Sequence, residues 1–274
     1  MSPMCCLING RPDERVGVAN RGLQYGDGLF ETIAIQDGRL LLWSQHLDRL
    51  AIGASRLGLA AINRALLTAE ATELAVGIQL GILKLMLVRE ASGRGYRPSS
   101  QEVDRILALW PWPARGVSAE GVDVMWCRTR LARQPQLAGI KHLNRLEQVL
   151  GQQELGSGHG EGLMQDTDGW VIAGTMSNVF LGERGALITP SLDYAGVAGV
   201  MRARVMDCAA DLGIRVTIDG ITRAHVLRAD EIFLTNSVLG VCAVRSLPER
   251  EYGRGPIAQR IHEAIRACGD AAVS

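Results

Sequence analysis

The sequence predicts a mixed α/β protein of the α+β kind, built as two domains. Strand-like apolar segments and amphipathic helical segments occur together in both halves of the chain. The 274 residues, 47% of them hydrophobic, are enough to build two hydrophobic cores. The run Pro111-Trp112-Pro113 interrupts this pattern near the middle of the chain. We therefore expect a smaller N-terminal α/β domain at 1–114, a linker at 115–120 and a larger C-terminal domain at 121–274.

The first half is predicted to alternate strands with two helices. Asp37-Gly38 is typical of a tight hairpin turn, which predicts a strand on each side of it. Ser44 is suited to begin a helix as its N-cap, and Gly58 is suited to end that helix. In chain order we expect a strand at 6–9, a glycine-rich stretch at 21–28, strands at 29–35 and 39–43, helices at 44–58 and 63–76, and strands at 80–89 and 105–110.

The second half shows the same mixture with shorter strands. Directly after Lys141, the apolar residues Leu143, Leu146, Val149 and Leu150 define an amphipathic helix. The expected elements are a strand at 122–128, this helix, a glycine-rich loop at 156–162, strands at 163–165, 169–172 and 178–181, a helix at 199–212, a strand at 215–218, a helix at 222–228, a strand at 231–235 and a helix at 256–267.

Composition narrows the classes of function. The formal net charge is zero, so no overall attraction to nucleic acid or to an anionic membrane is expected. No apolar run is long enough to span a bilayer, and the N-terminus lacks the pattern of a signal peptide. The six cysteines show no C-x-x-C spacing, which argues against a metal site or a disulfide framework and favours a cytoplasmic location.

Lysine is scarce, and its placement is informative. Of 29 basic residues only Lys84 and Lys141 are lysines. A lysine amine can lose its proton and attack a carbonyl, whereas an arginine guanidinium cannot, so a lysine in such a chain suggests a chemical role. Lys141 lies in an apolar-flanked stretch just before a helix, so we interpret it as a Schiff-base lysine. The alternative, which counting alone leaves equally open, is biased residue usage with two incidental lysines. Lys84 is expected on a strand, without lysine chemistry.

Other features suit an anionic aldehyde cofactor. The loop Gly196-Val197-Ala198 leads into a helix at Gly199, where backbone N–H groups can face a phosphate, although an ordinary helix start explains it equally well. Thr235-Asn236-Ser237 follows a strand and offers further donors. Arg49 could supply the counter-charge for the phosphate, but taken singly it is more typical of a solvated helix arginine. Phosphate-loop, H-E-x-x-H and G-x-S-x-G motifs are missing.

Taken together, these stretches resemble the fold-type IV class of pyridoxal-phosphate enzymes, which includes branched-chain and D-amino acid aminotransferases and aminodeoxychorismate lyases. The resemblance covers nearly the whole chain. It is carried by the residues at 25–32, 46–50, 139–148, 177–180, 196–202 and 229–233. The stretch 137–150 and the run Ser92-Gly93-Arg94-Gly95-Tyr96 are similar to the lyase branch in particular.

The resemblance implies a reaction and a set of site residues. It implies conversion of 4-amino-4-deoxychorismate to 4-aminobenzoate and pyruvate, a step toward folate, with pyridoxal 5'-phosphate (PLP) as cofactor. It also implies a homodimer with the cofactor in the cleft between its domains, the larger domain being the main cofactor-binding one. The implied roles are Lys141 as the lysine that carries the cofactor, Thr32 as a proton donor, Arg49, Val200, Met201, Asn236 and Ser237 around the phosphate, and Phe30, Arg94 and Tyr96 toward the substrate.

One position departs from the class pattern. Ala173 occupies the cofactor-binding position where the class has a glutamate that pairs with the pyridine nitrogen. The resemblance implies that loss of that partner would weaken an aminotransferase more than a lyase of this class, because aromatisation of the lyase's substrate ring itself drives elimination. Two alternatives stay open: a branched-chain or D-amino acid aminotransferase of the same fold, and a non-catalytic protein of that fold. Ala173 counts against the first, and retention of Lys141 and Arg49 counts against the second.

Overall fold

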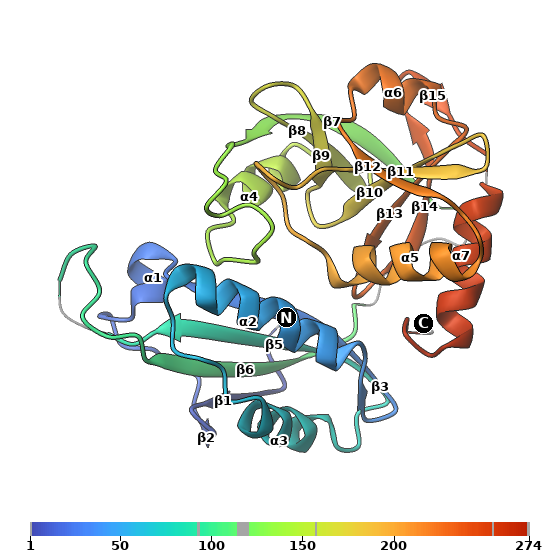
Figure 1. The fold of residues 1–274 in the computed structure, drawn as a ribbon. Helices are drawn as coiled ribbons and strands as arrows, with labels where there is room; N and C mark the ends of the chain where they lie inside the picture. Colours follow the sequence, from blue (N-terminus) through green and yellow to red (C-terminus); the bar gives the residue numbers. More distant parts are fainter. Residues whose placement is uncertain (1, 92–93, 114–120, 157, 254, 273–274) are drawn as a thin grey trace. The chain divides into compact units, whose positions relative to one another are not determined.

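The computed structural model describes residues 2–91, 94–113, 121–156, 158–253 and 255–272. The linker predicted at 115–120 lies outside the described residues. The chain divides into two compact units: Met1–Ala114 with Ile140–Asn144 and Ala272–Ser274, and Arg115–Gly139 with Arg145–Ala271. Seven helices and two β-sheets among the described residues confirm the mixed α+β class (Figure 1). The exact domain boundaries stay a prediction.

The first unit is built on a six-stranded sheet. Its strands are β1 (Cys5–Ile8), β2 (Arg11–Pro12), β3 (Gly28–Gln36), β4 (Arg39–Leu40), β5 (Leu80–Arg89) and β6 (Val103–Pro111), and its helices are α1 (Arg21–Tyr25), α2 (Trp43–Leu57) and α3 (Arg64–Ala75). The strands lie in the order β2-β1-β6-β5-β3-β4, and every pairing is antiparallel. The long central strands β3, β5 and β6 provide the rigid platform of this unit (Figure 1).

Side-chain alternation along β3 decides what each face of this sheet carries. Leu29 and Ile33 are buried and share one face, because residues two apart in a strand point the same way. Helix α2 packs on that face through Leu47 and Leu50, and its Gly53 allows close approach to Leu29. Phe30 and Thr32 point to the opposite face of the strand and are only half-buried.

The second unit is built on a nine-stranded mixed sheet. Its strands are β7 (Val122–Leu131), β8 (Glu161–Asp166), β9 (Val171–Gly174), β10 (Asn178–Glu183), β11 (Ala186–Pro190), β12 (Val216–Asp219), β13 (Glu231–Asn236), β14 (Gly240–Leu247) and β15 (Arg250–Glu251). They lie in the order β12-β11-β10-β13-β14-β7-β8-β9, with β15 on β14. The helices are α4 (Leu146–Gln153), α5 (Val200–Asp211), α6 (Arg223–Arg228) and α7 (Pro256–Ala267).

Both faces of the central strands of this unit are buried. Phe180 and Phe233 are cross-strand partners on β10 and β13, and their rings stack with centroids 5.0 Å apart. Leu181 and Ile232, on the other face, belong to a separate apolar cluster. Helices α5 and α7 lie side by side against the sheet (Figure 1). Such complete burial fixes the positions of the strand ends that carry the predicted site residues.

Several local expectations were wrong in detail. Ser44 does not cap α2; the N-cap is Leu42, which has a φ of 53° and makes no side-chain capping bond. The return strand expected at 39–43 is shortened to β4, because the helix already begins at Trp43. The strand expected at 105–110 is longer at both ends, because β6 begins at Val103 and ends at Pro111. None of the helices in the described ranges is both long and apolar enough to cross a membrane.

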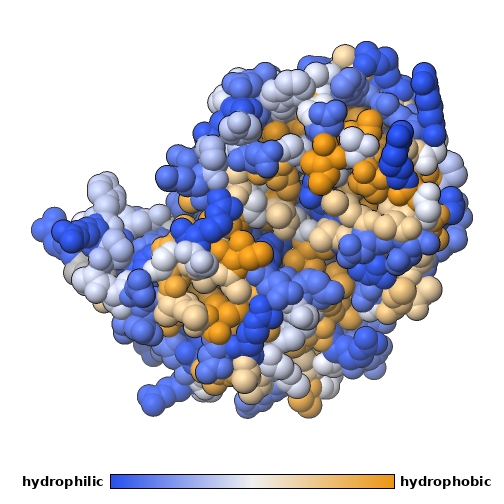
Figure 2. Space-filling model, viewed as in Figure 1, coloured by the Kyte–Doolittle hydropathy of each residue, from blue (hydrophilic) through white to orange (hydrophobic). Residues whose placement is uncertain are grey.

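Helix α4 has the predicted apolar face, but that face is uncovered. Leu146, Val149 and Leu150 are 76%, 48% and 51% exposed. Such a contiguous apolar face in water is unfavourable by about 25 cal/mol per Å² and is typical of an association surface. Elsewhere, Figure 2 shows hydrophobic side chains interspersed with hydrophilic ones over the visible face.

Candidate active site

Residues 141–143 extend the sheet of the first unit. The N–H of Phe30 donates to the carbonyl of Lys141 over 3.0 Å, and the N–H of Leu143 donates to the carbonyl of Gly28 over 3.0 Å. These bonds frame an antiparallel bridge between Leu29 and His142. The segment thereby occupies the edge of β3 that β4 leaves uncovered. Lys141 is thus fixed by backbone bonds, and the alternation of the bridge directs its side chain to the face that carries Phe30.

Both lysines of the protein lie over the same aromatic ring. Nζ of Lys141 is 4.3 Å from the centroid of Phe30, and Nζ of Lys84 is 5.4 Å from it. Lys84 is the cross-strand partner of Thr32, so these two side chains share a face of the sheet. The structure therefore gathers Lys141, Thr32, Phe30 and Lys84 on one half-buried face of β3 and β5. Lys84 lies on a strand, β5, as expected, and the register of β5 with β3 brings it close to Lys141.

A buried ionic group lies on the other face of β3. Both carboxylate oxygens of Glu31 accept from Arg49, through Nε over 2.9 Å and through Nη2. Nδ1 of His46 lies 2.6 Å from Oε2 of the same carboxylate. Arg49 therefore lies in a fixed orientation on α2 with its Nη1 edge directed away from Glu31. A solvated helix arginine, the other interpretation of Arg49, would not be held in this way.

The charges of this group are set by burial and by its own contacts. Burial alone would raise the pKa of Glu31, but the Arg49 guanidinium and the hydrogen bonds from His46 and Arg49 outweigh it and lower that pKa to about 2. Burial lowers the pKa of His46, opposed by Glu31 and assisted by the positive charges of Arg49 and Lys141. Glu31 is thus ionised at neutral pH, and it holds Arg49 as a fixed cation.

In the second unit, the N-terminus of α5 is suited to an anion. Its N-cap is Gly199, and no side chain caps the helix, so the first N–H groups of Val200 and Met201 are left to other partners. A Cβ atom at Gly199 would overlap Oδ1 of Asn178, whose Nδ2 donates to the carbonyl of Val197 over 2.9 Å. The loop is therefore shaped by Asn178 and requires glycine at 199. Helix N-termini of this kind bind phosphate.

At the end of β13, the side chain of Asn236 mainly stabilises the turn that follows. Oδ1 of Asn236 accepts from the N–H groups of Val238 and Leu239 over 2.9 and 2.8 Å, and Nδ2 donates to the carbonyl of Met176 over 3.2 Å. Ser237 is half-buried beside it. Among the described residues, the buried Oγ1 of Thr235 has no hydrogen-bond partner. A polar ligand at this turn would meet Thr235 as well as the predicted Asn236 and Ser237.

Ala173 leaves its position without a charged side chain. It is buried on β9, opposite Met164 of β8. The nearby carboxylate of Glu161 cannot replace a glutamate at this position, since it accepts from the N–H groups of Thr175 and Met176 over 3.0 and 3.2 Å and from the hydroxyl of Ser177 over 2.9 Å. Glu161 thus holds the turn after β9. The residues present fit the amine-reactive and phosphate ends of PLP, but at Ala173 they supply no counter-charge for a ring nitrogen.

The predicted substrate residues Arg94 and Tyr96 lie on an exposed loop. The ring of Tyr96 is 86% exposed and contacts Tyr25 edge-on, with centroids 5.5 Å apart. Two arrangements that matter locally were not predicted from the sequence: the pairing of Glu31 with Arg49 and His46, and the closeness of Lys84 to Lys141. The scarcity of lysine pointed to Lys84 but not to its neighbours. Glu31 could not be found, because it lies 18 residues from Arg49 along the chain, on a different element.

Comparison with known proteins identifies the family. Residues 28–247 match the model of the Amino-transferase class IV family. The chain is 34% identical over 248 residues to the aminodeoxychorismate lyase of Vibrio harveyi, with 89% of this chain and 92% of that protein covered. The crystal structure of 4-amino-4-deoxychorismate lyase from Pseudomonas aeruginosa superposes with a TM-score of 0.92 at 40% identity, over 97% of this chain and 99% of that one.

A more distant structure shares the fold alone. The branched-chain aminotransferase of the thermophilic archaeon Thermoproteus uzoniensis, solved with norvaline, has a TM-score of 0.87 at 24% identity, over 98% of this chain and 96% of that one. The fold is thus common to lyases and aminotransferases, whereas the family match spans most of the chain. The chain belongs to the Amino-transferase class IV family.

Proposed function

We propose that the protein is a PLP-dependent aminodeoxychorismate lyase, which converts 4-amino-4-deoxychorismate to 4-aminobenzoate and pyruvate. The observation that carries the proposal is the set of Lys141, Thr32 and Lys84 around Phe30, because it combines a reactive amine, a hydroxyl and a second cation on one face. The likeness to two lyases over about nine-tenths of the chain or more supports it.

Lys141 is the residue that binds the cofactor aldehyde and moves the first proton. Arg49, oriented by Glu31, and the N–H groups of Val200 and Met201 bind its phosphate, with Asn236 and Ser237 contributing beside them. When bound, PLP withdraws electrons from the carbon that bears the substrate amine. The neutral amine of Lys141 removes the proton from that ring carbon, a general-base step.

The remaining residues bind the substrate and handle the second proton. Elimination breaks the bond between the ring carbon and the enolpyruvyl oxygen, the ring becomes aromatic, and the released enol needs a proton on its methylene carbon. Thr32 or Lys141 supplies that proton. The substrate carries two carboxylates, and we assign Lys84 to one of them and Arg94 to the other, with Phe30 and Tyr96 against the ring.

Ala173 favours the lyase over an aminotransferase. Without a carboxylate at this position, Ala173 would offer no counter-charge to a protonated pyridine nitrogen, and the bound cofactor would be a weaker electron sink. Elimination from this substrate needs less of that property, because aromatisation is itself strongly favourable. A non-catalytic role is disfavoured, since Glu31 holds Arg49 and backbone bonds hold Lys141 in defined positions.

One assay tests the proposal. The protein is incubated with PLP and aminodeoxychorismate, and 4-aminobenzoate and pyruvate are measured. Equal yields of both products, absent from Lys141→Ala, are expected. Borohydride reduction followed by peptide mapping should place the pyridoxyl label on Lys141. Conversion of an amino donor to its keto acid instead, without aminobenzoate, would establish the aminotransferase, and no label at all would establish a non-catalytic protein.

We also propose a cytoplasmic homodimer that acts in folate synthesis. The uncovered apolar face of α4, formed by Leu146, Val149 and Leu150, supports association of two copies. All six cysteines are free thiols, which suits a reducing compartment. Light scattering after size exclusion should give twice the mass of the chain, and Leu150→Glu should give a monomer. A wild-type monomer at micromolar concentration would contradict the dimer.

A further inference from the structure

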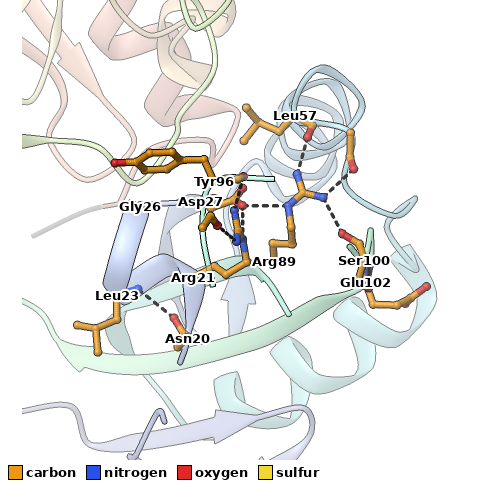
Figure 3. Close-up of polar contacts among 12 residues, drawn as sticks. Asn20, Arg21, Leu23, Gly26, Asp27, Leu57, Arg89, Tyr96, Ser100 and Glu102 are labelled. Carbon is orange, nitrogen blue, oxygen red and sulfur yellow. Dashed lines mark hydrogen bonds and ion pairs between the residues drawn. The ribbon is translucent and has the colours of Figure 1, made fainter. Parts of the chain in front are cut away.

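Two buried arginines converge on one carboxylate in the first unit (Figure 3). Nε of Arg21 donates to Oδ2 of Asp27 over 2.8 Å, and Nε of Arg89 donates to the same oxygen over 3.0 Å. Both guanidinium groups are almost completely buried. Local structure explains the approach of Asp27, because Gly26 ends α1 with a φ of 65° and turns the chain back toward Arg21. The cluster holds one more positive than negative charge, so its other donors need acceptors.

Those acceptors are backbone carbonyls at both ends of one loop segment and at the end of α2. Nη1 and Nη2 of Arg21 donate to the carbonyls of Gly95 and Tyr96 over 2.9 and 3.0 Å. Nη1 of Arg89 donates to the carbonyl of Ser100 over 3.1 Å, and its Nη2 donates to that of Leu57 at the end of α2 over 2.6 Å. The cluster therefore ties the segment 95–100 to β5 and to α2. Figure 3 shows both arginines directed at these carbonyls.

The side chains of this segment and of the preceding Arg94 are directed outward. Arg94 is exposed and Tyr96 is 86% exposed, although the carbonyls of Gly95 and Tyr96 accept from the buried Arg21. Arg21 also lies 4.9 Å from the centroid of Tyr25, the ring that Tyr96 contacts. An ordered backbone with exposed polar and aromatic side chains is the arrangement that presents groups to a ligand at little entropic cost.

We propose that the Arg21–Asp27–Arg89 cluster positions the loop that recognises the substrate carboxylate, and that Arg21 is its positioning residue. This inference rests on the proposed lyase function, in which Arg94 and Tyr96 contact the substrate. Arg21 itself acts through the loop. Its three nitrogens make three separate bonds, which a lysine cannot reproduce because it offers a single ammonium group.

The first arm of the test measures the loop in the absence of substrate. Arg21→Lys keeps the charge beside Asp27, and Arg21→Met removes it while Arg89 still pairs with Asp27. Arg105→Lys is the matched control, because Arg105 is forked on Glu70 in the same unit. The rate of trypsin cleavage is measured at the bond after Arg94, because the bond after Arg97 precedes Pro98 and is not readily cleaved by trypsin. The rate of chymotrypsin cleavage is measured at the bond after Tyr96.

Both Arg21 variants should be cleaved at these bonds about tenfold faster than wild type, as expected for a loss of about 1.4 kcal/mol in the free energy of local opening. The Arg105 variant should be cleaved at the wild-type rate. Equal cleavage rates for all the proteins, with unchanged far-UV circular dichroism, would show that Arg21 does not hold the segment 95–100 in place.

The second arm measures steady-state kinetics. Arg21→Lys should raise the KM for aminodeoxychorismate about tenfold and leave kcat within about twofold of wild type, the pattern of lost substrate binding. A fall in kcat with unchanged KM would overturn the positioning role. Wild type that yields no aminobenzoate would refute the lyase function and with it the kinetic role of Arg21, whereas the protease arm would still decide whether Arg21 holds the loop.

Discussion

The buried carboxylate of Glu31 allows a quantitative prediction. Its pKa is lowered from 4.5 to about 2 by Arg49 and His46 despite burial, so the folded protein is stabilised while this group is ionised. At about 1.36 kcal/mol for each pH unit, this corresponds to roughly 3 kcal/mol. Breaking a buried pair by removing one partner costs a similar amount, about 3–5 kcal/mol. Glu31→Gln should therefore lower the free energy of unfolding by about 3 kcal/mol at pH 7.

The pH dependence has a definite sign. Because the pKa of Glu31 is lower in the folded state, its stabilisation is fully present above about pH 4.5 and is lost as the pH falls from 4.5 toward 2. Urea unfolding followed by circular dichroism at pH 7 and at pH 3.5 would show this. The difference between wild type and Glu31→Gln should be smaller at the lower pH.

A matched control lies on α2, the helix that carries Arg49. Asp48 pairs with Arg64 over 2.6 Å, but both side chains are exposed, so Asp48→Asn should cost less than about 1 kcal/mol. Adding Arg49→Met to Glu31→Gln should cost less than the sum of the single changes, because the two partners act as one unit. The reasoning would be refuted if Glu31→Gln and Asp48→Asn were equally stable, or if the difference did not shrink in acid.

Three further changes address the site. Ala173→Glu should raise turnover and tighten PLP binding, measured by titration of cofactor absorbance; an unchanged or lower rate would contradict the assigned role of Ala173. Gly199→Ala should weaken PLP binding about tenfold or more, because the added Cβ meets Asn178, whereas Gly17→Ala, with open space around it, should bind normally. Lys84→Met should raise KM about tenfold with intact cofactor labelling at Lys141, and an unaltered KM would remove Lys84 from the site.

Strong local signals were sufficient for much of the fold. The bounds of β5 and α7 were predicted to the residue, because β5 is a long, mainly apolar run that Lys84 alone interrupts before Arg89, and α7 has a proline at its start and a clear apolar stripe. Helix α1 was missed, since five residues that include a glycine show no periodicity. Strand β14 was missed because its apolar residues run consecutively from Val241 to Val244 and show no polar alternation there.

The candidate site could be predicted only in part, for a similar reason. Lys141 was identified by its chemistry and by the scarcity of lysine. The neighbourhood of Lys84 depends on the register of β3 with β5, which is set by tertiary pairing. The ion pair between Glu31 and Arg49 depends on how α2 packs on β3. The hydrogen bonds from Arg21 to the segment 95–100 join residues more than seventy positions apart, so no local pattern indicates them. The roles assigned to all the predicted site residues, including those of Lys141, Thr32 and Arg49, stay predictions.

The placement of both side-chain amines over Phe30 makes the protein its own spectroscopic reporter. Lysine enriched in nitrogen-15 and carbon-13 would introduce only two labelled side chains, and each would experience the ring current of the same phenyl group. A molecule that enters this face would alter both signals together, whereas a distant conformational change would leave them alone. Isotope labelling of a single amino acid type would thus report on this face of the sheet alone in a 274-residue chain.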